Sequence, residues 1–395
     1  MRTANENGKV VAYLEGMVNS TNAPQVQQAL REALAANPES TLEIDAGALE
    51  FISSAGLRLL QQIRKSQGSL TVRNVTPEIY DILNVTGFIN LLEVKRKLRE
   101  FSVEGCPIVG RGAIGTVYRV DEDTIVKVYE NPDSLPMIEN EQRRAKQAFL
   151  KGIPTAISYD VVKVGDRYGS VFEMLKAATF NDLVIRHPEK LDDIVRRYAR
   201  FIRELHAVEM DRGALPEARA VFLDYLDALR DILPGALNAR LRSLFVAIPE
   251  NLHVVHGDIQ MKNVMFNGDE PLVIDMDTLS VGDPVFDLMG LYMVYVQFNE
   301  DEPTNSEDFL GIPAMVARAI WEKTMRCYFE DLDESALKAV ERKIIVVALV
   351  RFLYLVGVRN VGRPELKQVR IDNAIERLCQ LADRVDSLEV TPGGN

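Results

Sequence analysis

Apolar positions in the first hundred residues follow two periods, one typical of strands and one typical of helices. The β-rich runs at 9–16 (KVVAYLEG) and 41–46 (TLEIDA) predict strands, whereas residues 23–37 place their apolar side chains on one face of a helix. Residues 69–88 repeat the order of strand and helix. Because strands that alternate with helices form a sheet with helices packed on it, the pattern predicts an α/β domain in this part of the chain.

The longest apolar run, IIVVALVRFLYLVGV at residues 344–358, carries Arg351 at its centre. Its fifteen residues are fewer than the roughly twenty that a membrane-spanning helix needs, so the run predicts a buried helix. The polar residues 1–10 lack the apolar core of a signal peptide. The three cysteines are widely separated and odd in number, which does not suit a disulfide framework. We therefore expect a cytoplasmic protein without a membrane partner.

Length and charge limit the architecture and the partners. A chain of 395 residues is too long for one hydrophobic core of typical size, which predicts two or three domains. The net charge of −12 is uneven, because residues 1–100 hold 11 basic and 11 acidic side chains and the remainder holds 35 basic and 47 acidic ones. Nucleic-acid binding needs a basic face, so we expect no nucleic acid among the partners.

A strand runs through two serines into a helix at residues 49–60, LEFISSAGLRLL. A serine at a helix N-terminus is a good cap, and a phosphate placed there would meet free N–H groups and the helix dipole. This stretch resembles the STAS domain of anti-sigma-factor antagonists, over roughly residues 1–97. The resemblance implies a mixed sheet with helices, a protein partner, and regulatory phosphorylation of the serine two positions before the glycine, here Ser54 before Gly56. The alternative is that Ser53 and Ser54 only cap the helix.

Residues 107–129, PIVGRGAIGTVYRVDEDTIVKVY, predict a glycine-rich hairpin and a further strand. Glycines let the backbone approach phosphate oxygens, and Gly-x-Gly-x-x-Gly-x-Val suits a flap over a nucleotide. The residues of this pattern, which we expect to bind the nucleotide, are Gly110, Gly112, Gly115 and Val117. Lys127 follows on the strand expected beneath the flap, where its ammonium would lie near the phosphates. An exposed strand lysine is the alternative interpretation.

Two further segments complete the predicted nucleotide site. Residues 138–156 predict a helix that can present Glu141 to Lys127, with Glu139 as a nearby alternative. The apolar strand SVFEML then leads into a helix start, and we expect the last backbone groups of this strand to contact the edge of an adenine base. These groups belong to Glu173, Met174 and Leu175. The alternative interpretation is that these three residues only connect two lobes.

Acidic and amide side chains follow strand-like runs at HGDIQMKN (256–263) and VIDMD (273–277). A carboxylate beside buried strands is costly unless a cation meets it. Magnesium would be that cation, because phosphoryl transfer needs a metal that bridges anionic oxygens and a carboxylate that orients the attacking hydroxyl. This interpretation assigns Asp258 to the hydroxyl, and Asn263 and Asp275 to the metal.

The same two segments, with FIRELHAV at 201–208, resemble the aminoglycoside phosphotransferase and choline kinase superfamily, which has the protein-kinase-like fold. The resemblance spans about residues 101–300. It implies a bilobal α+β domain, with an N-lobe over residues 98–176 and a largely helical C-lobe over residues 177–395.

Carried over to this chain, the family's site implies that Asp258 is the catalytic base, that Asn263 and Asp275 bind magnesium, and that His256 organises the loop. Other polar residues near these segments have structural duties or two open interpretations. We expect Asp283 and Asp287 to pin the backbone after the metal site and His206 to lie in the core. Asp277 could touch the metal or have a solvated or capping role, and Lys262 could touch phosphate or remain on the surface.

These features predict a phosphotransferase that uses ATP or GTP with Mg²⁺ to transfer the γ-phosphoryl group to a hydroxyl of a small molecule, and that carries a regulatory STAS domain. The alternative is a signalling protein whose kinase-like domain is a nucleotide switch, or a protein kinase that phosphorylates Ser54 or a partner protein. Intact catalytic residues favour the enzyme, whereas the STAS fusion favours regulation.

Overall fold

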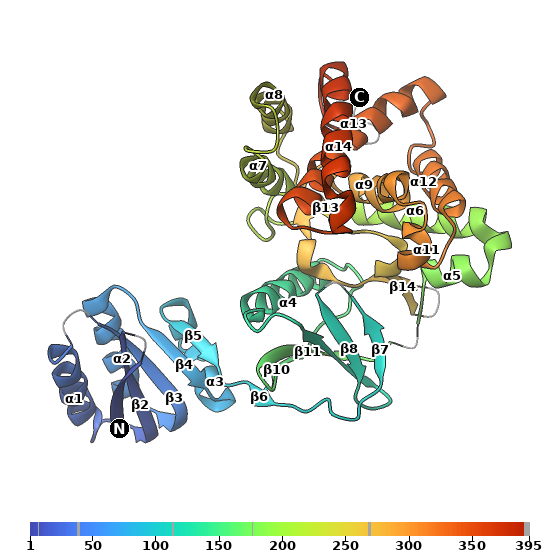
Figure 1. Ribbon diagram of the computed structural model, residues 1–395. Helices are drawn as coiled ribbons and strands as arrows, with labels where there is room; N and C mark the ends of the chain where they lie inside the picture. Colours follow the sequence, from blue (N-terminus) through green and yellow to red (C-terminus); the bar gives the residue numbers. More distant parts are fainter. Residues whose placement is uncertain (7, 38–39, 113, 176, 268–269, 391–395) are drawn as a thin grey trace. The chain divides into compact units, whose positions relative to one another are not determined.

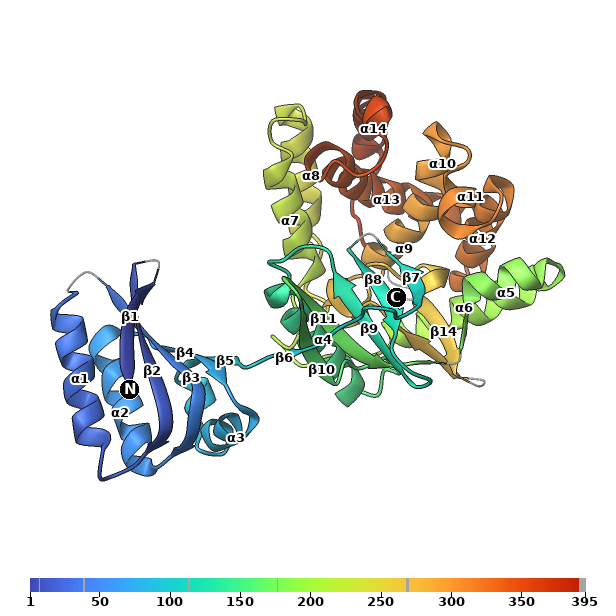
Figure 2. The same cartoon turned by 60° about the horizontal axis from the view of Figure 1, so that its bottom comes forward.

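The computed structural model describes residues 1–6, 8–37, 40–112, 114–175, 177–267 and 270–390. The chain divides into two compact units (Figures 1 and 2). The first unit comprises Met1–Ser102 and Val161–Asp166, and the second comprises Val103–Asp160 and Arg167–Asn395. Each unit has a hydrophobic core of its own.

The first unit is a mixed sheet with helices packed on it, which confirms the predicted α/β class. Its strands lie in the order β1–β2–β3–β4–β5, with β1 antiparallel to β2 and the other neighbours parallel. The helices α1 and α2 lie side by side (Figures 1 and 2). The elements are β1 (Arg2–Glu6), β2 (Lys9–Val18), α1 (Ala23–Ala35), β3 (Thr41–Ile52), α2 (Ser54–Gln67), β4 (Thr71–Val75), α3 (Pro77–Val85) and β5 (Glu93–Arg96).

Local chemistry explains the limits of α2. Ser53 is the N-cap, and its hydroxyl accepts the Ala55 N–H at 3.2 Å. Gly68 ends the helix at a φ of 82°, which glycine adopts without a steric penalty. A Cβ on Gly56 would lie 2.6 Å from Cγ1 of Ile52, so glycine lets the start of α2 approach the sheet.

Two strands of the first unit differ from the prediction. β3 runs without a break from the strand predicted at 41–46 to Ile52, and so includes the strand expected to lead into the two serines, because residues 48–52 also pair with β2. β1 (Arg2–Glu6) was not predicted, since its five residues are polar or small and mostly exposed. An edge strand that buries no apolar face gives little periodic signal. Within the same unit, the short β6 (Arg99–Glu100) pairs in parallel with β10 (Asp160–Val164).

The second unit begins with an antiparallel sheet in the order β11–β9–β8–β7, and α4 contacts it through Glu141, which lies beside Tyr129 and Lys127 of β9. Its elements are β7 (Ile108–Arg111), β8 (Gly115–Arg119), β9 (Thr124–Tyr129), α4 (Leu135–Leu150) and β11 (Arg167–Glu173). Figure 2 shows the helices from α5 onward gathered beyond this sheet. The arrangement of a sheet lobe and a helical lobe confirms the predicted bilobal class.

In the part of the chain that the structure describes, the helical lobe contains five short strands that flank the acidic segments. β12 (Ala178–Thr179), β14 (Val264–Asn267) and β15 (Glu270–Val273) form one small sheet, while β13 (Val254–Val255) pairs with β16 (Ser280–Val281). The helices are α5 (Phe180–Arg186), α6 (Leu191–His206), α7 (Ala218–Ala228), α8 (Gly235–Val246), α9 (Val285–Tyr292), α10 (Phe298–Asp301), α11 (Asn305–Leu310), α12 (Ala314–Tyr328), α13 (Glu334–Leu353) and α14 (Lys367–Leu381).

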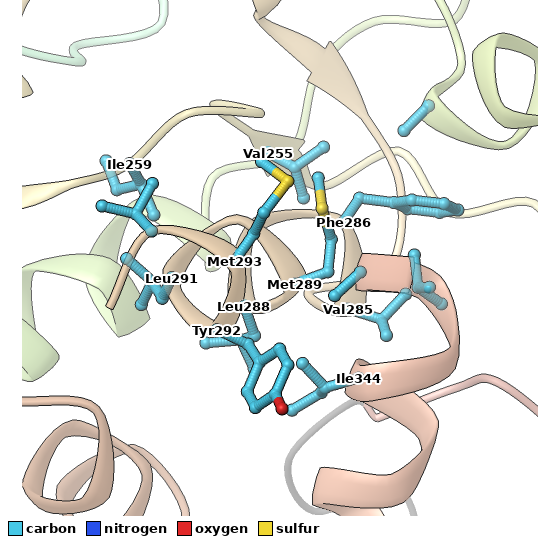
Figure 3. Packing of buried hydrophobic residues seen from close by; sticks show 14 of the residues in the cluster. Val255, Ile259, Val285, Phe286, Leu288, Met289, Leu291, Tyr292, Met293 and Ile344 are labelled. Carbon is cyan, nitrogen blue, oxygen red and sulfur yellow. The ribbon is translucent and has the colours of Figure 1, made fainter. Parts of the chain in front are cut away.

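The core of the helical lobe surrounds α9, which is buried at every position. Figure 3 shows Leu288 and Met289 of α9 between Val255 of β13 and Ile344 of α13. The apolar run at 344–358 lies in α13 and the π-helical turn that follows, which confirms the predicted buried helix. In the part of the chain that the structure describes, no helix has both the length and the apolar character for crossing a bilayer.

Candidate active site

Lys127 lies on β9 with its ammonium between two carboxylates. Its Nζ is 2.7 Å from Oδ1 of Asp275 and 3.6 Å from Oε1 of Glu141, and the side chain is 16% exposed. Burial alone would lower the pKa of Lys127, but the negative charges of Asp275 and Glu141 outweigh burial and raise that pKa above its ordinary value. Lys127 is therefore a fixed cation and not the exposed lysine of the alternative interpretation.

Glu141 reaches this position because α4 packs against the sheet. Its side chain is buried, and Oε2 accepts the hydroxyl of Tyr129 at 2.7 Å. Burial and the neighbouring charge of Glu141 raise the pKa of Tyr129, so the phenol remains a hydrogen-bond donor. Glu139, the alternative partner for Lys127, is exposed on the same helix.

The hairpin of β7 and β8 corresponds to the predicted flap. Gly110 pairs with Val117 across the hairpin, and Val117 pairs in turn with Lys127 on β9. The N–H of Gly112 donates to the carbonyl of Gly115 at 2.9 Å and closes the turn. The predicted nucleotide-binding residues of the hairpin therefore lie on strands continuous with the one that carries the lysine.

The glycines of the hairpin serve different purposes. A Cβ on Gly115 would lie 2.5 Å from the carbonyl oxygen of Val128, so glycine allows β8 to approach β9. A Cβ on Gly110 or Gly112 would meet no atom of the described residues closer than 3.6 Å. Packing accounts for Gly115, whereas it does not account for the other two, whose role in nucleotide binding stays a prediction.

Asp258 and Asn263 face each other across the loop between β13 and β14. Oδ2 of Asp258 accepts Nε2 of Gln260 and Nδ2 of Asn263, each at 3.0 Å, and the Asp258 carbonyl also accepts Nδ2 of Asn263 at 2.8 Å. The carbonyl of Asn263 accepts the N–H of Ile274 at 3.0 Å. That bond holds the loop beside Asp275, so the structure brings the three predicted polar residues together.

His256 is fully buried, and both of its ring nitrogens have partners. Nδ1 accepts the N–H of Asp258 at 3.3 Å, and Nε2 is 3.0 Å from the carbonyl of Ile274, which assigns the proton to Nε2. The hydroxyl of Thr278 donates to the His256 carbonyl at 2.8 Å. A histidine held in this way orders the loop and has no ring atom left for a substrate.

Asp287 on α9 is a buried carboxylate that anchors the same loop. It accepts the N–H of His256 at 2.8 Å, the N–H of Gly257 at 2.5 Å and Nε2 of His206 at 2.8 Å. Burial alone would raise the pKa of Asp287, but the hydrogen bond and charge of His206 outweigh burial and lower the pKa. His206 lies in the core, as predicted, and its second nitrogen contacts the hydroxyl of Tyr328.

The prediction for Asp287 was wrong in one respect. Asp287 holds the backbone before Asp258, and not the backbone after the metal site, because α9 packs beneath the start of the loop. Asp283 does hold the later backbone, since its Oδ1 accepts the N–H of Val285 at 2.9 Å and that of Val390 at 3.1 Å. The two acidic residues therefore fix different segments.

Asp275 has a φ of 66° and a ψ of 65°, in the left-handed region that few residues other than glycine adopt. Among the described residues, no group of three His, Cys, Asp or Glu side chains is placed to hold a metal. The carboxylate of Asp275 and the amide oxygen of Asn263 are nevertheless ligands that suit magnesium, which takes only one or two protein carboxylates and completes its shell with water and phosphate.

The predicted adenine edge needs one correction. The N–H of Met174 donates to the carbonyl of Asp123 at 2.7 Å, so that donor is not available to a base. Glu173 ends β11, where it pairs with Thr124, and Leu175 follows as a half-buried residue. A role for Glu173 and Leu175 at the base stays a prediction.

Two residues with open interpretations now have defined surroundings. Nζ of Lys262 donates to the carbonyl of Phe309 at 2.8 Å, which favours a structural role over a phosphate contact. Asp277 lies on the 3₁₀ turn after Asp275, and its carbonyl accepts a guanidinium N–H of Arg144. Burial, followed by the charge of Asp275, raises the pKa of Asp277 to about 6.

In the first unit, Ser53 caps α2 and Ser54 is the first helical residue, with an exposed side chain. The carbonyl of Ser54 accepts Nε of Arg58 at 3.2 Å. Capping by one serine therefore leaves the hydroxyl of the other on the surface. Phosphorylation of Ser54 stays a prediction.

Several residues that hold the loop carry no motif that would reveal them in the sequence. They support backbone groups on either side of Asp258, and all come from distant helices. Nη1 of Arg351 donates to the Gly257 carbonyl at 2.5 Å, the hydroxyl of Tyr198 donates to the Ile259 carbonyl, and the hydroxyl of Tyr295 accepts the Met261 N–H at 3.0 Å. Of these three residues, only Arg351 was marked in the sequence, because it is a charged residue within an apolar run.

Comparison with known families assigns both parts of the chain. Residues 106–309, just over half of the chain, match the phosphotransferase enzyme family, and residues 1–93 match the STAS domain of the Mlab type. The chain therefore belongs to the phosphotransferase enzyme family and carries a STAS domain at its N-terminal end. Both resemblances inferred from the motifs are confirmed.

Individual proteins resemble one or the other part. "Putative anti-sigma factor antagonist BtrV" of Bordetella bronchiseptica is 35% identical over 91 residues, which are 22% of this chain and 78% of that protein. The ADP-bound crystal structure of aminoglycoside phosphotransferase APH(2'')-Ib aligns at 17% identity with a TM-score of 0.48, over 78% of this chain and 99% of that one. A choline/ethanolamine kinase family protein from Mesorhizobium loti aligns at 19% identity with a TM-score of 0.44, over 70% of this chain and 87% of that one.

Proposed function

We propose that the protein transfers the γ-phosphoryl group of ATP or GTP, with Mg²⁺, to a hydroxyl of a small molecule. One observation carries this proposal: a continuous polar network joins Asp258 through Asn263 to the segment of Asp275, and Asp275 in turn contacts Lys127. A carboxylate for the acceptor, oxygen ligands for a metal and a cation for phosphates are the parts that phosphoryl transfer needs.

Each residue has a definite role in this proposal. Asp258 orients the acceptor hydroxyl and takes its proton, while Asn263 holds the carboxylate of Asp258 in place. Lys127, fixed by Glu141, meets the phosphates of the nucleotide. Asp275 and the amide oxygen of Asn263 would hold magnesium, which when bound neutralises the phosphate oxygens.

The proposal assigns domains accordingly. Residues 1–97 form the STAS domain, residues 98–176 form the N-lobe with the glycine hairpin, and residues 177–395 form the C-lobe with the acceptor side of the site. The charge of residues 101–395, which is strongly negative, supports a small-molecule acceptor and not nucleic acid.

We further propose that the STAS domain binds a protein partner next to Ser54. Met17 and Phe51 are paired across β2 and β3 near the start of α2, and their side chains are 50% and 41% exposed. Two adjacent exposed apolar side chains beside an exposed hydroxyl form a surface on which phosphorylation would change binding. This surface also favours a second candidate function, in which the protein is itself a protein kinase that phosphorylates Ser54.

One experiment separates the candidates. The full-length protein is incubated with γ-labelled ATP or GTP, Mg²⁺ and a metabolite extract, and the label is then located. Label in a small molecule supports the proposed reaction. Label on the chain that disappears in a Ser54→Ala variant indicates a protein kinase, and nucleotide that binds without transfer of its label indicates a switch.

A further inference from the structure

A cavity of about 210 Å³ lies beside the loop that carries Asp258, on the side of α7 and α13. Two arginines, Arg144 of α4 and Arg351 of α13, line the cavity together with Asp277. None of the residues that the proposed function assigns to nucleotide, metal or acceptor belongs to its lining, whereas Asp277, for which a metal contact was one of the open interpretations, does. The cavity is therefore separate from the predicted phosphotransfer residues, although it shares the wall formed by Gly257.

The two arginines present unused donors. One N–H of Arg144 donates to the carbonyl of Asp277, and one N–H of Arg351 donates to the carbonyl of Gly257 at 2.5 Å. The Nε atoms of both arginines are buried and have no hydrogen-bond partner among the residues that the structure describes. A buried donor without an acceptor costs about 1–3 kcal/mol, so both arginines lie in the wall of the cavity with part of their hydrogen-bonding capacity unsatisfied.

Apart from Thr278 and Ser280, the rest of the lining is mostly apolar and aromatic. Phe222 is one of the lining residues, and its ring centroid lies 5.1 Å from that of Tyr225 and 5.0 Å from that of Phe286. The ring of Phe286 extends from α9 (Figure 3). An apolar cavity of roughly 150 Å³ accommodates benzene, so the volume here is sufficient for a ligand with one ring and a charged group.

We propose that this cavity binds a small organic anion whose acidic group contacts Arg144 and Arg351 and whose apolar body packs on Phe222. Two guanidinium groups and the carboxylate of Asp277 leave one positive charge in the lining, which a single anion neutralises. Guanidinium forks match the planar geometry of a carboxylate and form strong charge-assisted hydrogen bonds with it.

Binding would affect the neighbouring loop. Arg351 holds the residue that precedes Asp258, and Arg144 holds the backbone two residues after Asp275. A ligand that draws either guanidinium toward itself changes the support of these two segments, so we expect it to alter phosphoryl transfer. The expected change in phosphoryl transfer rests on the proposed function, whereas binding of the anion does not.

Calorimetry on the full-length protein tests binding without any turnover. The probes are benzoate and its neutral analogue benzamide. We expect benzoate to bind the wild-type protein at least roughly tenfold more tightly, which corresponds to one charge-assisted hydrogen bond. Arg144→Gln and Arg351→Gln should each remove this preference, and the exposed Arg196→Gln should retain it.

A second variant leaves both arginines unchanged. Val221 of α7 lines the cavity, and Val221→Phe should fill it and abolish benzoate binding, while circular dichroism and thermal unfolding confirm a folded protein. Equal affinity for benzoate and benzamide, absence of benzoate binding to the wild type, or unchanged binding in Val221→Phe or in both arginine variants would each overturn the proposal.

Discussion

Replacement of Asp287 by asparagine keeps the size of the side chain and removes one of its acceptor oxygens. In the native structure Oδ2 accepts the N–H of His256 and Nε2 of His206, while Oδ1 accepts the N–H of Gly257. The amide of asparagine has a single oxygen, so in either orientation its NH₂ group faces at least one backbone N–H. A buried donor without an acceptor costs about 1–3 kcal/mol, and a hydrogen bond to a charged group contributes about 1.5–3 kcal/mol. We expect Asp287→Asn to lower the free energy of unfolding by about 3 kcal/mol.

The fluorescence of Trp321, the single tryptophan of the chain, reports on this change because it is buried in α12 of the same unit. Urea unfolding at neutral pH gives the free energies of wild type and variant. Asp193→Asn, which removes an exposed charge paired with Arg196, is the control and should change the value by less than about 1 kcal/mol. An Asp287→Asn variant as stable as this control would refute the anchoring role.

The pH dependence has a definite sign. The pKa of Asp287 is lowered by folding, so its ionised form stabilises the protein above the ordinary carboxyl pKa of 3.8. That contribution is lost as the pH falls through the folded-state value. The difference in stability between wild type and Asp287→Asn should therefore narrow in acid, and a difference that grows on acidification would contradict the assignment.

Four further substitutions have expected outcomes. Gly115→Ala forces a Cβ to 2.5 Å from the Val128 carbonyl oxygen and should destabilise the second unit by about 1–3 kcal/mol in urea unfolding, whereas Gly110→Ala should change stability by less than half as much. Lys127→Met should lower the turnover number roughly 100-fold in a steady-state assay, and turnover close to wild type would exclude a role at the phosphates. Ser53→Ala removes the cap of α2 and should destabilise the first unit by about 1 kcal/mol. Hydrogen exchange of the amides of residues 1–102, measured in the full-length protein, gives this change in the free energy of unfolding.

Local patterns predicted most elements, because caps, glycine stops and apolar periodicity act over a few residues. Thr76 and Pro77, a residue type suited to the N-cap and one suited to the first helical position, begin α3, and Gly68 follows the last residue of α2. The early end predicted for β3 and the unpredicted β1 have one cause, since neither segment alternates apolar and polar residues regularly. Strand limits of this kind depend on neighbouring strands and not on local chemistry.

The site shows the same division between local and distant information. The spacing of Asp258 and Asn263 indicated a shared loop, and the structure places them 3.0 Å apart at their side chains. The hydrogen bond from Arg351 to Gly257 joins residues 94 positions apart, and nothing in the local sequence specifies that register. The bond that occupies the N–H of Met174 likewise depends on where another strand, β9, begins.

The central claim is that the acidic groups around Lys127 and Asn263 form a site for a nucleotide with its magnesium ion. Titration calorimetry of the full-length protein with ATP and GTP, in the presence and absence of Mg²⁺, tests this claim most directly. We expect one nucleotide to bind with Mg²⁺ and to bind more weakly without it, and we expect Asp275→Asn to remove most of the dependence on the metal. Absence of binding by both nucleotides, or affinity that depends on neither Mg²⁺ nor Asp275, would contradict the account.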